Sequence, residues 1–386
     1  MAWLRLRRDP GGGCIDGRAG GADLTRGEAM PDFRTSRRHF VQMAAAGLLA
    51  GMSADAAWAQ FVAPPAARAD PTADTEFDVP LSIEVKARPI PSFDRQHHDR
   101  VRFGALEYRS GLVLTSSFPA FGGLSGLRLD AKGERFISLS DKGNWFAGRI
   151  VYQGRAMAGL ADVETAPMRG ADGRPIMTRG WFDSESIAID GSFVYIGLER
   201  VNKLLRFDLS QGIGRARGEV VPLPKAASRL PFNKGLEALV FVPKGMPLAG
   251  TLIAMSERGL DARGNLIAFL VGGPTPGQFS LRRSADFDVS DAMLLTSGDL
   301  LILERKFSWL SGVGIRIRRI PLKSVAPGAI VDGPSIFEAD LAFEVDNMEG
   351  IDAHISPEGE TVLTMVSDDN FSMIQRTLLL QFTLVE

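Results

Sequence analysis

The chain has 386 residues, of which 45% are hydrophobic and 23% charged, and its formal net charge is −2 at pH 7. This mixture is typical of a globular protein with a hydrophobic core and excludes a disordered or coiled-coil chain. The charge balance excludes the strongly basic surface that nucleic acid binding usually needs. Glycine (42) and proline (22) are frequent and scattered, as expected where many turns join short strands.

The N-terminal region has the features of an export signal. Arg37 and Arg38 form a twin-arginine pair before a short apolar run from Met43 to Met52. Ala57-Trp58-Ala59 then has the small residues of a cleavage site. We expect residues 1–59 to be a cleaved Tat-type signal region and the protein to be periplasmic or secreted, without membrane contact after cleavage.

Three further expectations concern the same end of the chain. Met30 is a candidate for the true start, since a conventional charged segment follows it. Cys14, the one cysteine, lies in the signal region, so the mature chain would form no intramolecular disulfide and no thiolate metal site. Residues 60–77 are rich in Ala, Pro and Asp and are expected to form a disordered tether before a folded domain at 78–386.

From residue 80 onward the pattern predicts an all-β domain. Short apolar runs alternate or cluster as strands do, with hardly any helical period between them. Examples are FISLS (136–140), FVYIGL (193–198), LLILE (300–304) and TLLLQFTLV (377–385).

A repeat appears when these strands are aligned by the residues that precede them. An acid or a serine, followed by a small residue, stands at the start of one strand in each repeat, and the repeats are 52 to 60 residues apart. The residues at this first position are Ser125, Glu185, Glu237, Asp291 and Glu349. A period of this length predicts blades of about four strands in a β-propeller.

A second element follows in each repeat, where the next strand ends in a charged pair. Its copies are Asp141-Lys142, Glu199-Arg200, Glu257-Arg258, Glu304-Arg305 and Asp368-Asp369. Five repeats are countable, so we expect five or six blades, with residues 81–90 contributing to a sixth if one exists. The last repeat is about one strand short, and residues 103–115 are the natural N-terminal strand to close the C-terminal blade.

The inner strand of each propeller blade lines the axis, so the first position would form a ring at one mouth. Carboxylates gathered there repel one another and require a cation or basic side chains. One interpretation is a Ca²⁺ site, because hard divalent ions bind oxygen ligands, with Glu185, Glu237, Asp291 and Glu349 as the metal ligands. Substrate contacts are then expected from Ser125, Asp141, Lys142, Glu199, Glu257, Glu304 and Asp368. The alternative is that the acid and arginine pairs are salt bridges between blades.

Several motifs together resemble the phytase-like family of exported bacterial proteins (esterase-like activity of phytase). They are FGGLSGL (121–127), LSDKG (139–143), DSESI (183–187), GLEAL (235–239) and NMEGID (347–352). The resemblance implies a β-propeller that hydrolyses phosphate or carboxylate esters with Ca²⁺ as cofactor. It also implies catalytic roles for one of Glu185, Glu237 and Glu349 as general base, and for Arg200, Arg258 and Arg305 in stabilising negative charge.

Two alternatives stay open at this point. The first is a lactonase-like sugar-acid hydrolase, and the second is a non-enzymatic binding or scaffold propeller. Whether the protein is an enzyme is therefore undecided from the sequence. A small anionic or ester substrate and a monomeric state are the expectations for partners.

Overall fold

The computed structural model describes residues 78–308 and 312–385, which belong to one compact unit. The predicted signal region and tether, with Met30 and Cys14, lie outside the described residues. Within the described part, no helix has the length and apolar character needed to cross a bilayer.

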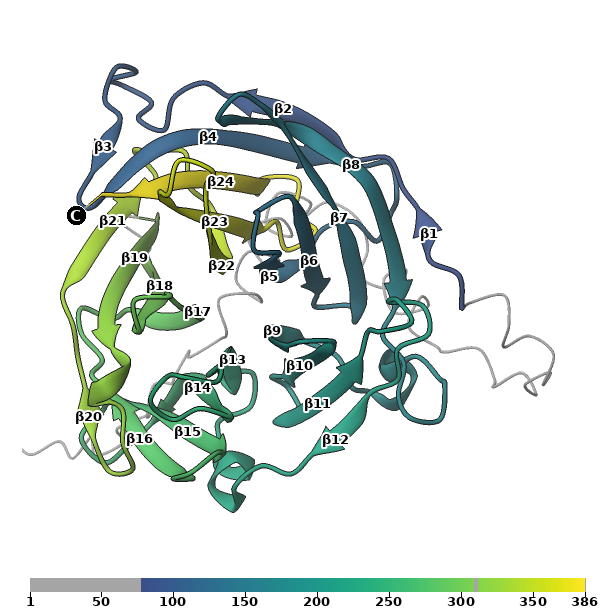
Figure 1. Cartoon of the computed structure of the whole chain (residues 1–386), viewed down its shortest axis with the longest axis vertical. Coiled ribbons are helices and arrows are strands. Elements are labelled where there is room, and N and C mark those ends of the chain that lie inside the picture. The colour runs from purple at the N-terminus through teal and green to yellow at the C-terminus, as the bar shows by residue number, and fades with distance from the viewer. Residues whose placement is uncertain (1–77, 309–311, 386) are drawn as a thin grey trace, which may run out of the picture. The chain divides into compact units, whose positions relative to one another are not determined.

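The described residues form five sheets arranged as blades around one axis, which confirms the predicted all-β propeller (Figure 1). Blade 1 contains, from the axis outward, β5 (Leu124–Leu129), β6 (Arg135–Ser140), β7 (Asn144–Gln153), β8 (Ala156–Pro167) and β1 (Leu81–Ser82). Blade 2 contains β9 (Ser184–Asp190), β10 (Phe193–Leu198), β11 (Lys203–Asp208) and β12 (Glu219–Val221).

The other three blades follow the same order. Blade 3 contains β13 (Leu236–Phe241), β14 (Thr251–Leu260), β15 (Leu266–Gly272), β16 (Gly277–Leu281) and β20 (Ile330–Val331). Blade 4 contains β17 (Asp288–Leu294), β18 (Asp299–Ser308), β19 (Gly312–Pro321) and β21 (Ser335–Asp340). Blade 5 contains β22 (Asn347–Ile355), β23 (Thr361–Asp368), β24 (Thr377–Leu384), β4 (Leu106–Thr115) and β2 (Lys86–Ile90), with β3 (Arg102–Phe103) beside β4.

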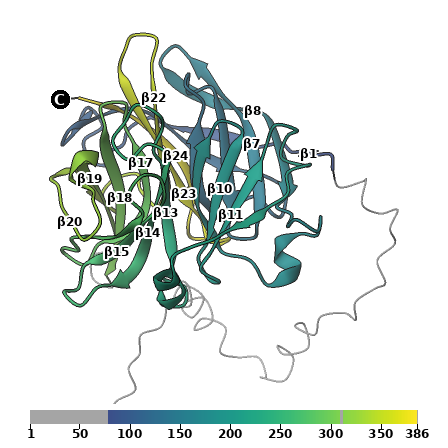
Figure 2. The same cartoon turned by 60° about the horizontal axis from the view of Figure 1, so that its bottom comes forward.

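Short 3-10 helices lie in the loops between these strands. They are η1 (Ile176–Arg179), η2 (Lys225–Arg229) and η3 (Leu322–Ser324). Figure 2 shows the turned molecule, with the connecting loops gathered at the two ends of the ring.

The N-terminal strand β4 closes the ring, as predicted. It pairs antiparallel with β24, with Leu112 opposite Leu379, and β2 then pairs with the outer side of β4. No sixth blade exists among the described residues, because β1 joins blade 1 and β2 joins blade 5. Residues 81–90 therefore link the first and last blades instead of building another.

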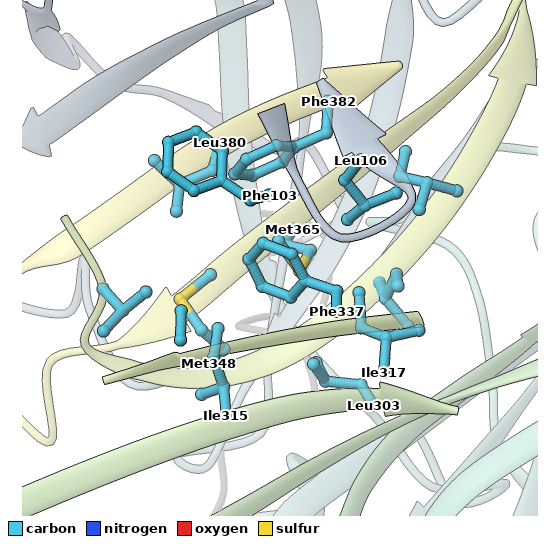
Figure 3. Close-up of a cluster of buried hydrophobic side chains, with 14 of the residues drawn as sticks. Phe103, Leu106, Leu303, Ile315, Ile317, Phe337, Met348, Met365, Leu380 and Phe382 are labelled. Carbon is cyan, nitrogen blue, oxygen red and sulfur yellow. The ribbon is translucent and has the colours of Figure 1, made fainter. Parts of the chain in front are cut away.

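A hydrophobic cluster fills each interface between neighbouring blades of the described part. Figure 3 shows the one between blades 4 and 5, where Leu303 and Phe337 from blade 4 pack with Met348 and Phe382 from blade 5. These four side chains are at most 1% exposed. Burial of this kind is the main stabilising contribution and holds the blades at fixed positions around the axis.

The inner strands of blades 5 and 1 approach one another closely at the small residue that follows Glu349. A Cβ added to Gly350 in β22 would lie 2.9 Å from the backbone nitrogen of Leu127 in β5. A larger residue there would push blade 5 away from blade 1. This close contact explains why a small residue follows the acid in the predicted motif.

Arg128 ties the inner strands together across the axis. Its guanidinium forms a bidentate pair with Asp291, with N–O distances of 2.8 and 3.1 Å. The same group donates to the carbonyls of Leu239, Ala292 and Ile351, at 2.9 to 3.1 Å. One side chain of blade 1 thus binds the inner strands of blades 3, 4 and 5.

We expect Arg128→Met to lower the free energy of unfolding by about 3–5 kcal/mol, because it leaves the buried carboxylate of Asp291 without its counter-ion. Arg149→Met is the matched control, since its pair with Asp162 is exposed and should contribute less than about 1 kcal/mol. Urea unfolding of the two variants measures the difference. Equal losses would contradict the role given to Arg128.

Candidate metal and substrate site

A β-bulge at the start of each inner strand turns one side chain out of the regular ladder. In β9, Ser184 and Ser186 pair with Leu198 and Gly197 of β10, and the ladder skips Glu185 between them. The same register shift recurs in the other four blades. A bulge redirects the extra residue and increases the local twist. The residues redirected in this way are Ser125, Glu185, Glu237, Ser290 and Glu349.

A second set of side chains lies beside the bulges. On the second strand of each blade, the residue that pairs across the bulge is followed by a charged one. These residues are Asp141, Glu199, Glu257, Arg305 and Asp368. Their positions explain the two predicted motifs, since both motifs mark the same end of the ring. We call these ten residues the axial ring.

Blade 4 differs from the prediction by one residue at both positions. Alignment by residue type places Asp291 and Glu304 in the ring, whereas the ladder places Ser290 and Arg305 there. Asp291 occupies the position of the small residue, and Arg128 binds both of its carboxylate oxygens. The structure therefore does not bring Asp291 into the metal group.

Glu304 also lies away from the ring, on the other face of β18. Its carboxylate accepts hydrogen bonds from Arg316 at 2.8 Å and from Arg318 at 2.6 and 2.8 Å. It is fully buried within blade 4. This arrangement makes Glu304 a structural salt-bridge residue of its blade, and the predicted substrate contact has no support in the geometry.

The axial ring gathers carboxylates from several blades into groups that could hold a metal ion. Glu185, Glu237 and Glu349 offer oxygens that lie within 4.8 Å of one another, and each side chain is buried. Two further groups share a residue with this one. One contains Glu199, Glu237 and Glu257, and the other contains Asp183, Glu185 and Glu199. Three of the four predicted metal ligands are thus brought together.

Arg305 is the principal basic side chain among these carboxylates. Its guanidinium pairs with Glu349, lies 3.1 Å from Glu237 Oε1 and lies 3.6 Å from Glu257 Oε1. It also donates to Asn347 Oδ1 at 2.8 Å. Glu257 is paired with Lys234 in addition. Despite burial, these two cations lower the pKa of Glu257, so that this carboxylate stays ionised.

Glu237 is in a different electrostatic state. Its side chain is 1% exposed, and while Oε1 faces Arg305, the buried Oε2 has no hydrogen-bond partner. Burial raises the pKa of Glu237 well above its usual range, and the charges of Glu199, Glu185 and Glu257 raise it further, against the opposing effect of Arg305. A buried oxygen without a partner, aimed among other carboxylates, is the feature expected of a cation ligand.

Basic side chains with aromatic partners lie at the rim of the site. Lys142 is exposed, with its ammonium 3.2 Å from the centre of the Phe371 ring. Arg200 lies over Phe182 and over Phe232, at 4.4 and 5.4 Å, and about a third of its side chain is exposed. Both cations could therefore contact an anion that enters the mouth.

Arg258 differs from these two rim residues. It is bound by the carboxylate of Asp288 in the next blade. This is the predicted alternative, a salt bridge that locks two blades together.

Two members of the ring in blades 1 and 5 form local hydrogen bonds. Ser125 Oγ donates to Asp141 Oδ1 at 2.9 Å, and the backbone N–H of Asn370 donates to Asp368 at 2.6 Å. Ser125 is fully buried. Its place in the ring agrees with the prediction that it is a polar member of the repeat.

Several residues that the sequence patterns did not select lie next to the axial ring. Asp183 and Asn347 each stand two positions before a bulged glutamate, and Asp288 stands two before Ser290. A polar residue two positions before the bulged residue recurs in three blades, and this recurrence could have identified these residues from the sequence. Lys234 and Arg128 have no counterparts in the other repeats, so periodicity could not find them.

The raised pKa of Glu237 predicts a pH-dependent stability for the metal-free protein. A carboxyl whose pKa is higher in the folded than in the unfolded state binds more protons when folded, so stability falls as the pH rises above its unfolded pKa. Glu237→Gln should remove this loss, about 1.4 kcal/mol for each unit of raised pKa.

The measurement is denaturant unfolding in a chelator between pH 4.5 and 8. The glutamine variant should become more stable than the wild type toward the upper end of this range. Glu219→Gln, at an exposed pair with Arg206, is the control and should keep the wild-type profile. A stability advantage of Glu237→Gln that does not grow with pH would contradict the assignment.

Comparison of the sequence with known proteins identifies a family. The Phytase-like family, described as "Esterase-like activity of phytase", matches residues 119–371. No curated protein matches the chain.

Among solved structures, glutaminyl cyclase of Myxococcus xanthus is 12% identical, with 69% of this chain and 92% of that one covered and a TM-score of 0.36. The PQQ-bound aldose sugar dehydrogenase of Streptomyces coelicolor is also 12% identical, with 79% and 99% covered and a TM-score of 0.33. Similarity at this level says nothing about the activity of this chain. The family match covers more than half of the chain and includes the whole axial ring, so the protein belongs to the Phytase-like family.

Proposed function

We propose that the protein is an exported hydrolase of phosphate or carboxylate esters, assisted by a divalent cation, with Ca²⁺ the ion that fits best. The observation that carries this proposal is the buried group of Glu185, Glu237 and Glu349, in which Glu237 Oε2 has no partner. The family description, which names an esterase-like activity, supports the reaction class.

The donor set fits a hard cation. The candidate ligands are carboxylate oxygens, which Ca²⁺ prefers, and the group contains neither sulfur nor imidazole. Glu185, Glu237 and Glu349 would hold the ion, with Glu199 adjacent. When bound, a divalent ion supplies positive charge for an ester oxygen and lowers the pKa of a coordinated water.

The chain's own residues have separate tasks in this proposal. Arg305 holds Glu237 and Glu349 in place, which makes it a positioning residue. Arg200 and Lys142 bind the anionic part of the substrate at the rim through charge-assisted hydrogen bonds. The exposed ring of Phe232 beside Arg200 can pack on an apolar part of the same molecule.

Calcium binding should be visible as a stability change. An ion that binds the folded state at a hundredfold excess over Kd stabilises by about 2.7 kcal/mol, which corresponds to a rise of several degrees in the melting temperature. We expect this rise for the chelator-treated mature protein and its loss in Glu185→Gln. Glu219→Gln should show the wild-type rise.

Turnover tests the reaction itself. With Ca²⁺ present, the protein should hydrolyse phosphomonoesters or short acyl esters, and Arg200→Gln should raise KM for the anionic substrates at unchanged folding. Lactone turnover without phosphate release would instead favour the sugar-acid hydrolase. A protein that melts cooperatively with Ca²⁺ bound and turns over none of these substrates would overturn the proposal.

A further inference from the structure

Blade 4 carries a cation at a ring position where the other four blades carry an acid. The equivalent residues are Asp141, Glu199, Glu257 and Asp368, while blade 4 has Arg305. The bulged position of the same blade is Ser290, which donates to Glu349 Oε2 at 3.2 Å. Blade 4 therefore adds no negative charge to the ring and adds one positive charge.

The guanidinium of Arg305 lies where a second cation would be coordinated. It contacts one oxygen each of Glu237, Glu257 and Glu349, which come from blades 3 and 5. The residue is 9% exposed, and its guanidinium is held by Asn347 as well. Removing it would leave three buried carboxylates facing a common space.

Glu237 has a second carboxylate oxygen that Arg305 does not bind. Oε1 of Glu237 faces Arg305, whereas Oε2, also buried, has no hydrogen-bond partner. Glu185 and Glu199 are the carboxylates that approach Glu237 in the neighbouring groups. Glu237 thus offers one oxygen to Arg305 and keeps the other available to an ion.

We propose that Arg305 is a built-in substitute for a second metal ion and limits the site to one divalent cation. This inference rests on the ion site of the proposed function. It states that Arg305 determines how many ions the site binds. Neither the family nor the reaction class specifies this number. A covalently attached cation also keeps Glu257 and Glu349 in place when no ion is present.

Loss of the guanidinium should open the second position. In Arg305→Gln, Glu237 and Glu349 lose their counter-ion while Glu257 keeps only Lys234, and burial of unpaired carboxylates is strongly destabilising. We expect this variant to fold only with Ca²⁺ and to bind two ions. Arg305→Lys keeps a single positive charge in place and should bind one ion, as the wild type does.

The ions are counted by elemental analysis after the protein is folded in Ca²⁺ and passed through a desalting column, and by calorimetric titration where the apo form is folded. Arg258→Gln is the matched control, because this arginine binds Asp288 outside the ring and its loss should leave one ion.

Each other outcome is decisive. Two ions in the wild type, or one ion in Arg305→Gln, would overturn the inference while leaving the ion site of the proposed function intact. Failure of Arg305→Gln to fold in saturating Ca²⁺ would overturn it too, because the second ion is expected to replace the guanidinium. Absence of any ion in the wild type would instead refute the proposed function on which the inference rests.

Discussion

The arrangement of the site depends on one constraint: carboxylates buried at the axis of the propeller need positive charge beside them. Each inner strand has a bulge at the same end, so the glutamates of three blades meet in one buried group. Like charges in a low-dielectric region repel strongly, and the fold must supply positive charge nearby. Arg305 and Lys234 supply part of it, and Glu237 shows by its raised pKa that compensation is incomplete.

The same constraint operates further along the axis, with a different solution. Asp291 replaces the small residue of the repeat, and Arg128 reaches across from blade 1 to bind it. This pair is closed, because each carboxylate oxygen has a guanidinium partner and a backbone N–H donor. One axial layer is therefore structural and satisfied, whereas the layer above it retains an oxygen that can bind a ligand.

Much of the fold could be predicted from the sequence, because strand period, repeat length and the missing last strand are properties of local segments. The ring positions of Glu185, Glu237 and Glu349 followed from the same repeat. The ring residues of blade 4 could not be predicted in this way. Asp291 and Glu304 match the motif by residue type, but the bulge places Ser290 and Arg305 in the ring. Ladder register depends on pairing across strands, which a single sequence does not display. Arg128 and Lys234 were missed because neither repeats.

The central claim is that the carboxylates of blades 2, 3 and 5 surround one cation. Anomalous diffraction from crystals of the mature protein grown in Ca²⁺ tests it most directly. The account predicts a single anomalous peak within coordination distance of Glu185, Glu237 and Glu349, with Glu237 Oε2 among its ligands. A fully loaded crystal without a peak there, or with its ion bound at a surface loop, would contradict the account.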